Sequence, residues 1–130
     1  MNLAQRSSFI KETAGGLGFD YCGIAPATTL NEDARRLESW LQAGMHGKMH
    51  YMENHFDLRI DPSKLVPGAQ SVITLLVNYF PNETPKNNKI KIAKYAYGKD
   101  YHLVIKKKLK IFHAVLKKQF GDFYGRGFVD

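Results

Sequence analysis

The sequence predicts an α+β fold in which a mixed β-sheet is flanked by helices. Residues 70–80 form an apolar, β-branched run, as in a strand covered on both faces of a sheet. Residues 89–97 alternate lysines with apolar residues, as in a half-exposed strand. Residues 101–120 repeat apolar side chains at helical spacing, and this is the longest helix pattern in the chain. Further strands are expected at 20–25 and 123–130.

The N-terminal third reads as helix, strand and helix. Residues 2–17 place apolar side chains at helical spacing, and the glycines of the stretch Gly15–Gly18 supply a C-cap. The strand candidate at 20–25 follows. The stretch Thr29–Glu32 has the form of a capping box and opens a second helix that runs to about Ala43.

Two histidines stand four residues apart in the next stretch, 44–52. On a helix His46 and His50 would share one face, but Gly47 weakens a helix. No glutamate follows His46 as a zinc protease requires. The pattern therefore disfavours a metal site, and it favours a loop or short helix that covers a ligand or the core.

Residues 56–68 are predicted to be extended and irregular, because Pro62 and Pro67 interrupt regular structure. Arg59 lies within this segment and has two possible roles. It can form an ion pair with Asp57 or Asp61, or it can bind an anionic group of a ligand.

The stretch 95–102 joins the strand candidate at 89–97 to the long helix. It combines tyrosines, a glycine, both signs of charge and a histidine. Asp100 is expected to cap a helix over Tyr101–Phe120, which ends at Gly121. A strand-to-helix junction turns the backbone and directs free N–H groups outward, so it is a place where folds present functional groups.

Composition limits the classes of protein. The formal net charge is +7, with 19 Lys and Arg against 12 Asp and Glu, and much of the excess lies in residues 86–118. This favours a polyanionic partner such as nucleic acid, although a well-solvated basic surface has the same composition.

The single cysteine and the apolar runs exclude other classes. Cys22 cannot form an intramolecular disulfide or hold a metal cluster alone, and a small buried side chain is expected there. The longest apolar run, Val72–Val77, is too short to cross a bilayer, so no membrane partner is expected. The N-terminus has no apolar signal region, and a cytoplasmic location is the default expectation. Nothing in the sequence indicates an oligomeric state.

Five stretches in this order resemble one family. They are Phe19–Pro26, Gly44–Met52, Arg59–Ala69, Tyr97–His102 and Phe128–Asp130. Together they are similar to the N-terminal region of epoxyqueuosine reductases, which are cobalamin-dependent iron–sulfur enzymes. The resemblance extends over essentially the whole chain.

The resemblance implies an oxidoreductase that completes queuosine in tRNA. Such enzymes reduce an epoxide to an alkene on the wobble nucleoside, using cobalamin and two [4Fe–4S] clusters. Residues 1–130 then form a single domain, the front, cobalamin- and substrate-binding part of a longer chain. In such enzymes the cluster cysteines lie in a ferredoxin-like part further along the chain, and none of them is present here, since Cys22 stands alone. The fragment by itself is expected to be inactive.

The resemblance also implies roles for five residues. Asp130 matches the general acid that protonates the oxygen as the epoxide opens. Arg59 matches an arginine that donates to corrin side-chain amides, and Ala93 matches a small residue lining the same pocket. Tyr97 and His102 are expected as walls of the pocket. For His102 a plain role at the helix N-terminus, bonded to neighbouring backbone, also stays open.

The resemblance gives the basic surface a partner, the anticodon stem-loop of tRNA, whose phosphates lysines can hold without reading sequence. Two other classes stay open. One is a stand-alone basic RNA-binding module without a cofactor, although no RNP-type strand or GxxG loop is present. The other is a related corrinoid reductase for small molecules, such as a reductive dehalogenase; Asp130 and the lysine excess argue against it.

Overall fold

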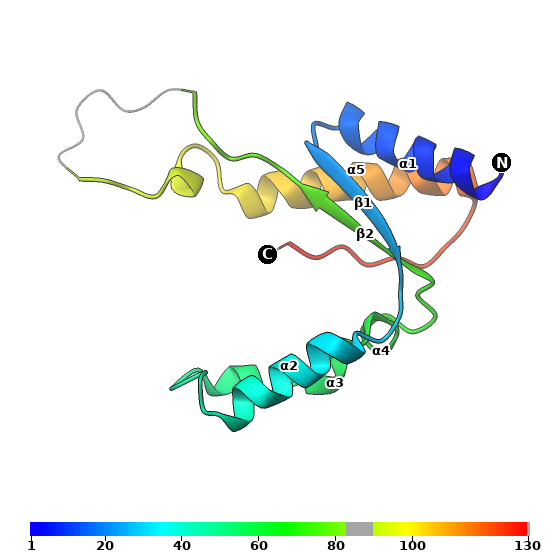
Figure 1. Ribbon diagram of the computed structural model, residues 1–130. Coiled ribbons are helices and arrows are strands. Elements are labelled where there is room, and N and C mark those ends of the chain that lie inside the picture. The colour runs from blue at the N-terminus through cyan, green and yellow to red at the C-terminus, as the bar shows by residue number, and fades with distance from the viewer. Residues whose placement is uncertain (83–89, 130) are drawn as a thin grey trace. The chain divides into compact units, whose positions relative to one another are not determined.

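The structure, a computed structural model, describes residues 1–82 and 90–129 (Figure 1). It consists of two compact units. One comprises residues 1–23 and 73–130, and the other comprises residues 24–72. We describe each unit separately. None of the described helices combines the length and the apolar character that a lipid bilayer requires of a spanning segment.

The first unit is built on two packed helices, α1 (Leu3–Gly16) and α5 (Tyr101–Phe120), as Figure 1 shows. The helix predicted at 2–17 is thus confirmed. It begins with a capping box that sequence reasoning missed: Asn2 and Gln5 each accept a 2.9 Å hydrogen bond from the other's backbone N–H. Gly18, at φ +85°, lets the chain leave the helix.

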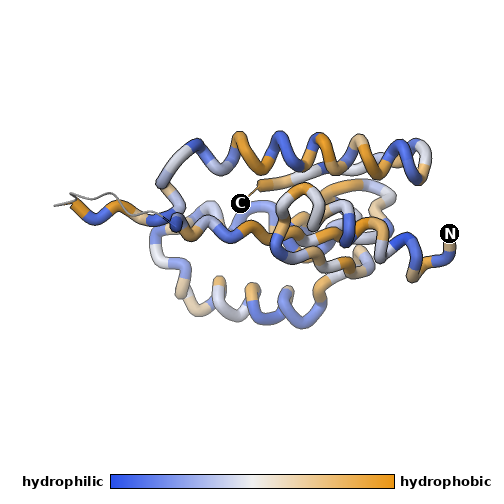
Figure 2. The backbone as a smooth tube through the Cα atoms, turned by 90° about the horizontal axis from the view of Figure 1, so that it is seen from above, coloured by the Kyte–Doolittle hydropathy of each residue, from blue (hydrophilic) through white to orange (hydrophobic). Residues whose placement is uncertain are grey.

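Helix α5 has the bounds that the sequence predicted. The Asp100 side chain accepts from the backbone N–H of His102, and Gly121 ends the helix at φ +85°. Along α5, at the top of Figure 2, hydrophobic and hydrophilic residues alternate from turn to turn. One face therefore contributes to the core while the lysines occupy the others.

The core of this unit is small. Its buried members are Ala14, Phe19, Phe112 and Leu116. Half-buried apolar residues of both helices and both strands pack around them. The ring of Phe19 meets that of Phe112 edge-to-face at 6.4 Å between centroids.

The strands β1 (Tyr21–Pro26) and β2 (Ser71–Leu76) pair into a two-stranded sheet, and the boundary between the units falls within both strands. The N–H of Asp20 donates to Leu76 at 2.9 Å and that of Ala27 donates to Gln70 at 3.0 Å, so the pairing is antiparallel. The α+β class is confirmed.

The prediction of a mixed sheet of four strands is wrong for the described residues, which form a sheet of two strands. β2 is not covered on both faces, because its residues alternate between half-buried and exposed. Of the predicted strand at 89–97, the structure describes residues 90–97, and these contain the 3-10 helix η2 (Lys94–Ala96) instead. Alternating lysines and apolar residues fit a half-exposed strand only where a neighbouring strand offers backbone partners.

The predicted strand at 123–130 is also absent over residues 123–129. This segment runs back along α5: a Cβ placed on Gly125 would meet His113, and one placed on Gly127 would meet Leu109. The two glycines let the backbone lie against the helix, and glycine weakens a strand.

The second unit is helical apart from the strand ends that it contains. It contains α2 (Asn31–Gln42), the 3-10 helix η1 (His50–Glu53), α3 (Phe56–Ile60) and α4 (Pro62–Leu65). The prediction of a loop or short helix at 44–52 is confirmed by turns and η1.

Two predictions in this unit are wrong. Residues 56–68 are largely helical rather than extended, because Asp61 caps α4 and Pro62 occupies its first turn, where a missing N–H costs nothing. Thr29 does not cap α2, whose N-cap is Leu30 without a side-chain bond. The Thr29 hydroxyl donates to the Asp61 carboxylate at 3.1 Å instead.

The core between α1 and α5 makes a quantitative prediction. Leu116→Ala should destabilise the chain by about 2–5 kcal/mol, because Leu116 is only 5% exposed and the cavity cannot fully collapse. Urea unfolding followed by circular dichroism measures this free energy. Leu103→Ala on the same helix is the matched control, since Leu103 is 67% exposed, and its cost should stay below about 0.5 kcal/mol. Equal losses in the two variants would contradict the assigned core.

Candidate functional site

The junction at 95–102 is built by three successive backbone features. η2 turns the chain, Gly98 takes φ +79°, and the Asp100 carboxylate accepts a 3.0 Å bond from the N–H of His102. This backbone bond, followed by the bond to the imidazole of His102, lowers the pKa of Asp100. Asp100 therefore stays ionised at neutral pH and holds the start of α5.

Aromatic rings line this junction. The ring of Tyr79 meets that of Tyr95 edge-to-face at 6.4 Å, and Tyr95 meets Tyr101 in the same way at 6.1 Å. Tyr101 stacks on His102, with 4.0 Å between centroids. We call Tyr79, Tyr95, Tyr101 and His102 the aromatic cluster. His102 could be singled out from the sequence, but Tyr79 could not, because its contact with Tyr95 joins loops distant in the chain.

Two predicted site residues lie beside the aromatic cluster in sequence. Ala93 is exposed and precedes η2, and Tyr97 is half-buried and follows it. The Lys94 ammonium lies 3.8 Å from the centroid of the Phe80 ring, a cation–π contact. The exposed surface here thus combines flat rings, a small side chain and a positive charge, which suits a large planar ligand with polar edges.

His102 lies at the helix N-terminus, as in the plain role left open above, but its partner is the Asp100 carboxylate rather than neighbouring backbone. Its backbone N–H satisfies the cap, and its Nδ1 lies 3.1 Å from the Asp100 carboxylate. The imidazole is exposed, so its outer edge still faces solvent. A structural role and a place in a pocket wall are therefore compatible.

Arg59 on α3 does not form the predicted ion pair with Asp57 or Asp61 in the described structure. Its Nε donates to the carbonyl of Asn54 at 3.0 Å, and one Nη donates to that of Tyr51 at 3.2 Å. These bonds hold the guanidinium against the chain segment that precedes α3, while its charge is not neutralised by a carboxylate among the described residues. Arg59 can thus act as an oriented cation.

Asp61, which directly follows α3, connects the start of α4 to the residues that precede α2. Its carboxylate accepts from both the hydroxyl and the backbone N–H of Ser63, at 2.6 and 2.9 Å, and from the hydroxyl of Thr29. The hydroxyl of Ser63 is the largest cause of a lowered Asp61 pKa. The backbone N–H of Leu30 also donates to the carbonyl of Ile60 at 2.8 Å, which joins the end of α3 to the residue before α2.

Three metal-ligating side chains converge in the second unit: His46, His50 and Glu53. Their ligand atoms all lie within 4.8 Å of one another. The Nε2 of His46 donates to Glu53 at 2.6 Å, and this bond lowers the pKa of the Glu53 carboxyl. The sequence motif of a zinc protease places a glutamate directly after the first histidine, so it does not reveal Glu53, which lies three residues after His50.

The predicted site residues are thus distributed over the two units. Arg59 belongs to the unit of residues 24–72, and Ala93, Tyr97 and His102 belong to the other. Asp130 lies outside the described residues, so its role stays a prediction. Cys22 is half-buried rather than buried as expected, and desolvation raises the pKa of its thiol.

The lysines form a basic surface on α5. Lys106, Lys107 and Lys110 are exposed, whereas Lys108 lies over the ring of Phe19, 5.7 Å from its centroid. Further along, Lys117 forms an ion pair with Asp122 at 3.4 Å. Lys106, Lys107 and Lys110 thus have no carboxylate partner among the described residues and can neutralise an external anion.

Comparison with known proteins identifies related sequences. A family profile described as "Epoxyqueuosine reductase QueG, DUF1730" matches residues 59–130, more than half of the chain. An epoxyqueuosine reductase of Cyclobacterium marinum is 55% identical over 130 residues, covering 98% of this chain and 42% of the relative. One from Escherichia coli is 35% identical, covering 100% of this chain and 36% of the relative. The chain therefore spans about two fifths of the length of such relatives.

Solved structures agree with this match. A selenomethionine-labelled epoxyqueuosine reductase superposes with a TM-score of 0.77 at 25% identity, over 93% of this chain and 33% of that one. An epoxyqueuosine reductase with an epoxyqueuosine-modified tRNA-Tyr stem loop gives 0.76 at 24% identity, over 91% and 32%. The fold described above is therefore shared with these proteins.

Asp61 makes a pH-dependent prediction. The pKa of Asp61 is lower in the folded chain than its ordinary value of about 3.8. Its carboxylate therefore stabilises the fold at pH values above about 3.8, and this stabilisation is lost as the pH falls through the lowered pKa. Asp61→Asn should therefore lower the urea midpoint at pH 7, and the difference from the parent chain should shrink below about pH 4.

Asp57→Asn is the matched control, because the Asp57 carboxylate accepts no hydrogen bond from any described residue. It should leave the midpoint at pH 7 nearly unchanged. A difference between Asp61→Asn and the parent chain that stays constant from pH 7 down to the acid limit of folding would refute the role of the carboxylate.

Proposed function

The chain belongs to the epoxyqueuosine reductase QueG family, and on this premise we propose that it is the N-terminal part of an epoxyqueuosine reductase. The complete enzyme reduces the epoxide of epoxyqueuosine to the alkene of queuosine at the wobble position of tRNA. The observation that carries the proposal is the family match over residues 59–130, which contains every residue singled out for the site. We assign residues 1–130 to binding of cobalamin and substrate.

The described residues fit a corrin in their chemistry. A corrin is a large flat ring edged by amide groups, and the first unit offers exposed rings, with the small Ala93 close by in the chain. The guanidinium of Arg59 is oriented by two carbonyls and retains donors for amide oxygens. We assign Arg59, Ala93, Tyr97 and His102 to holding the cofactor. Bound cobalamin would supply electrons to the epoxide.

The chain itself supplies a proton in this mechanism. Opening an epoxide leaves negative charge on oxygen, and a carboxylic acid at that oxygen lowers the barrier by protonating it as the carbon–oxygen bond breaks. We assign this role to Asp130 because of its place in the Phe128–Asp130 stretch. The reduction takes up electrons and protons, and the oxygen leaves as water.

Electrons must come from another part of the protein. The only cysteine, Cys22, is half-buried with a raised pKa, and a [4Fe–4S] cluster requires four cysteine thiolates. We therefore assign the two clusters to the remainder of the full-length enzyme. The chain alone is expected to bind cobalamin and tRNA but not to reduce the epoxide.

The basic face of α5 supports tRNA as the substrate. Exposed lysines without carboxylate partners bind phosphates independently of sequence, and the target base must leave its stack to react. We assign Lys106, Lys107 and Lys110 to this contact with the anticodon stem-loop. An enzyme acting on tRNA works in the cytoplasm, and we propose that location.

Cobalamin binding tests the cofactor assignment. Titrating cobalamin into the chain should change the visible spectrum of the corrin, and Arg59→Ala should weaken binding about tenfold or more through loss of charged hydrogen bonds. Ala93→Leu should weaken it too, and because Ala93 is exposed this change should leave the unfolding midpoint unaltered. Ala93→Leu thus distinguishes a blocked pocket from a loosening of residues 51–59, which Arg59→Ala could cause by removing the bonds to Tyr51 and Asn54.

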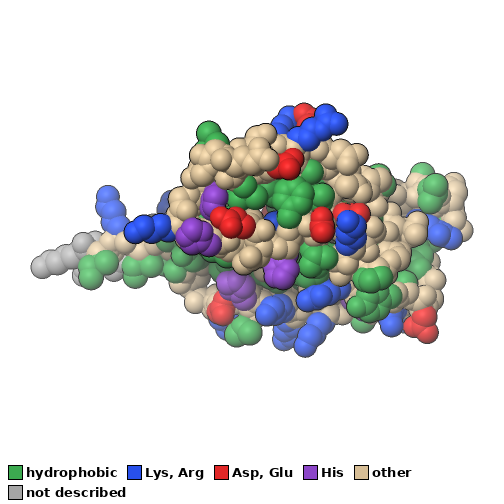
Figure 3. Space-filling model, turned by 90° about the horizontal axis from the view of Figure 1, so that it is seen from below, with side chains coloured by type: hydrophobic (Ala, Val, Ile, Leu, Met, Phe, Trp, Pro, Cys, Tyr) green, Lys and Arg blue, Asp and Glu red, His purple; other side chains and the backbone are tan. Residues whose placement is uncertain are grey.

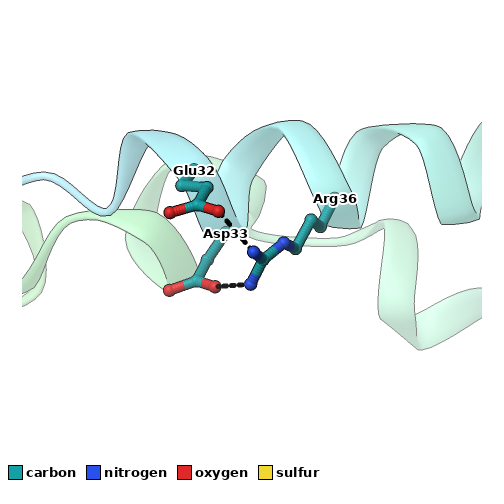
Figure 4. Close-up of polar contacts among 3 residues, drawn as sticks. All are labelled: Glu32, Asp33 and Arg36. Carbon is teal, nitrogen blue, oxygen red and sulfur yellow. Dashed lines mark hydrogen bonds and ion pairs between the residues drawn. The ribbon is translucent and has the colours of Figure 1, made fainter.

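Arg36→Ala is the matched control. Arg36 also carries an exposed guanidinium in the second unit, but Glu32 and Asp33 pair with it on α2 (Figure 4). Its loss should change the affinity for cobalamin less than about twofold. No spectral change in the parent chain, together with salt-sensitive RNA binding, would favour the stand-alone RNA-binding module instead.

Salt dependence tests the assignment of the lysines. The logarithm of the association constant for an anticodon stem-loop should fall linearly with the logarithm of the salt concentration. The double variant Lys106→Ala/Lys110→Ala should make this slope shallower by about 1 to 2. Lys11→Ala/Lys48→Ala removes the same charge from exposed positions elsewhere and should change the slope little. Equal reductions by both double variants would show that net charge alone attracts the RNA.

A further inference from the structure

The cluster of His46, His50 and Glu53 is not used by the proposed function. Within residues 1–82 and 90–129 it is the one group in which three or more potential metal-ligating side chains converge. Figure 3, a view from below, shows histidine side chains next to acidic side chains on the surface. Two local features of the backbone bring His46, His50 and Glu53 together.

The first feature is the short helix η1. His50 and Glu53 are its first and last residues, three apart. In a 3-10 helix side chains at i and i+3 lie one above the other, so the spacing aligns the imidazole with the carboxylate. The Nδ1 of His50 lies 3.6 Å from the Glu53 oxygen, close enough for both to reach one ion.

The second feature is the loop that contains His46. Gly44 and Gly47 take φ +66° and +56°, a conformation that favours glycine, and they turn the chain on both sides of His46. The imidazole is only 8% exposed and lies against the ring of Trp40, 5.7 Å between centroids. One ligand is thus fixed by packing before any ion binds, whereas His50 and Glu53 remain exposed and accessible.

We propose that His46, His50 and Glu53 form a binding site for a divalent transition-metal ion of the zinc type. Two imidazoles and one carboxylate suit Zn²⁺, Co²⁺ or Ni²⁺, and they do not suit Mg²⁺ or Ca²⁺, which prefer all-oxygen sites. Three protein ligands leave a fourth tetrahedral position for water or an external group. An ion between Nε2 of His46 and Glu53 replaces the proton that their hydrogen bond now shares.

The other nitrogen of His46 sets the strength of this site. Its Nδ1 is buried and has no hydrogen-bond partner among the described residues. A histidine that binds metal through Nε2 carries its proton on Nδ1, where an acceptor ordinarily orients the ring. Without one, the affinity should be about 10- to 100-fold below that of a fully supported site. The site is therefore suited to exchangeable rather than permanent metal.

Metal titration tests the proposal independently of cobalamin and RNA. The tag-free chain, stripped with a chelator, is titrated with Zn²⁺ against a chromophoric chelator. We expect one Zn²⁺ per chain, no binding of Mg²⁺, and with Co²⁺ the visible absorption of a tetrahedral site. His50→Ala and Glu53→Gln should each lower the affinity at least about tenfold, which is the loss that even an outer-shell partner causes.

His55→Asn is the matched control, because His55 is an exposed imidazole in the same segment but outside the cluster. Its φ is +57°, which asparagine tolerates, so the backbone should be preserved. Its affinity for Zn²⁺ should stay within about twofold of the parent. Less than one Zn²⁺ per chain, or equal losses in His55→Asn and His50→Ala, overturns the proposal, because scattered surface imidazoles would then explain the binding.

Discussion

The close packing of α1 on α5 is the contact on which the first unit depends. Ala14 is fully buried there, and its small side chain lets the helices approach closely. Phe9 on α1 meets Phe120 on α5 edge-to-face at 5.5 Å. Because only four side chains in the described structure are buried and apolar, the two-stranded sheet owes its support to this helix pair. The same packing fixes the axis of α5, and so the direction in which its lysines point and the place where its N-terminal junction lies.

The elements that could be predicted from sequence are those with strong local signals. α5 combines an aspartate cap, a long apolar period and a terminal glycine, and its predicted bounds agree with the structure. The segments at 89–97 and 123–130 were wrong as strands, over the residues that are described, because alternation does not say whether a partner strand is within reach. The helices at 56–65 were missed because Asp61 acts locally as a cap, which overrides the disruptive effect expected of Pro62.

The candidate site was predictable only where residues stand in recognisable stretches. Arg59, Ala93, Tyr97 and His102 could be named from family resemblance, but their contacts could not. For Arg59 the sequence left open an ion pair with a neighbouring aspartate or an anionic ligand, and it could not reveal the backbone carbonyls that the guanidinium binds. The aromatic cluster and the grouping of Glu53 with two histidines depend on tertiary structure and on 3-10 geometry, which a helical or strand period does not reveal.

The contact between Trp40 and His46 has a practical consequence. Trp40 is the only tryptophan of the chain, and it belongs to the unit of residues 24–72, where its ring lies 5.7 Å from an imidazole. Its fluorescence is therefore an intrinsic reporter of one unit, whereas the backbone signal of α1 and α5 comes from the other. Emission and circular dichroism, recorded in one experiment, can thus reveal whether the two halves of this small chain lose their structure together or one after the other.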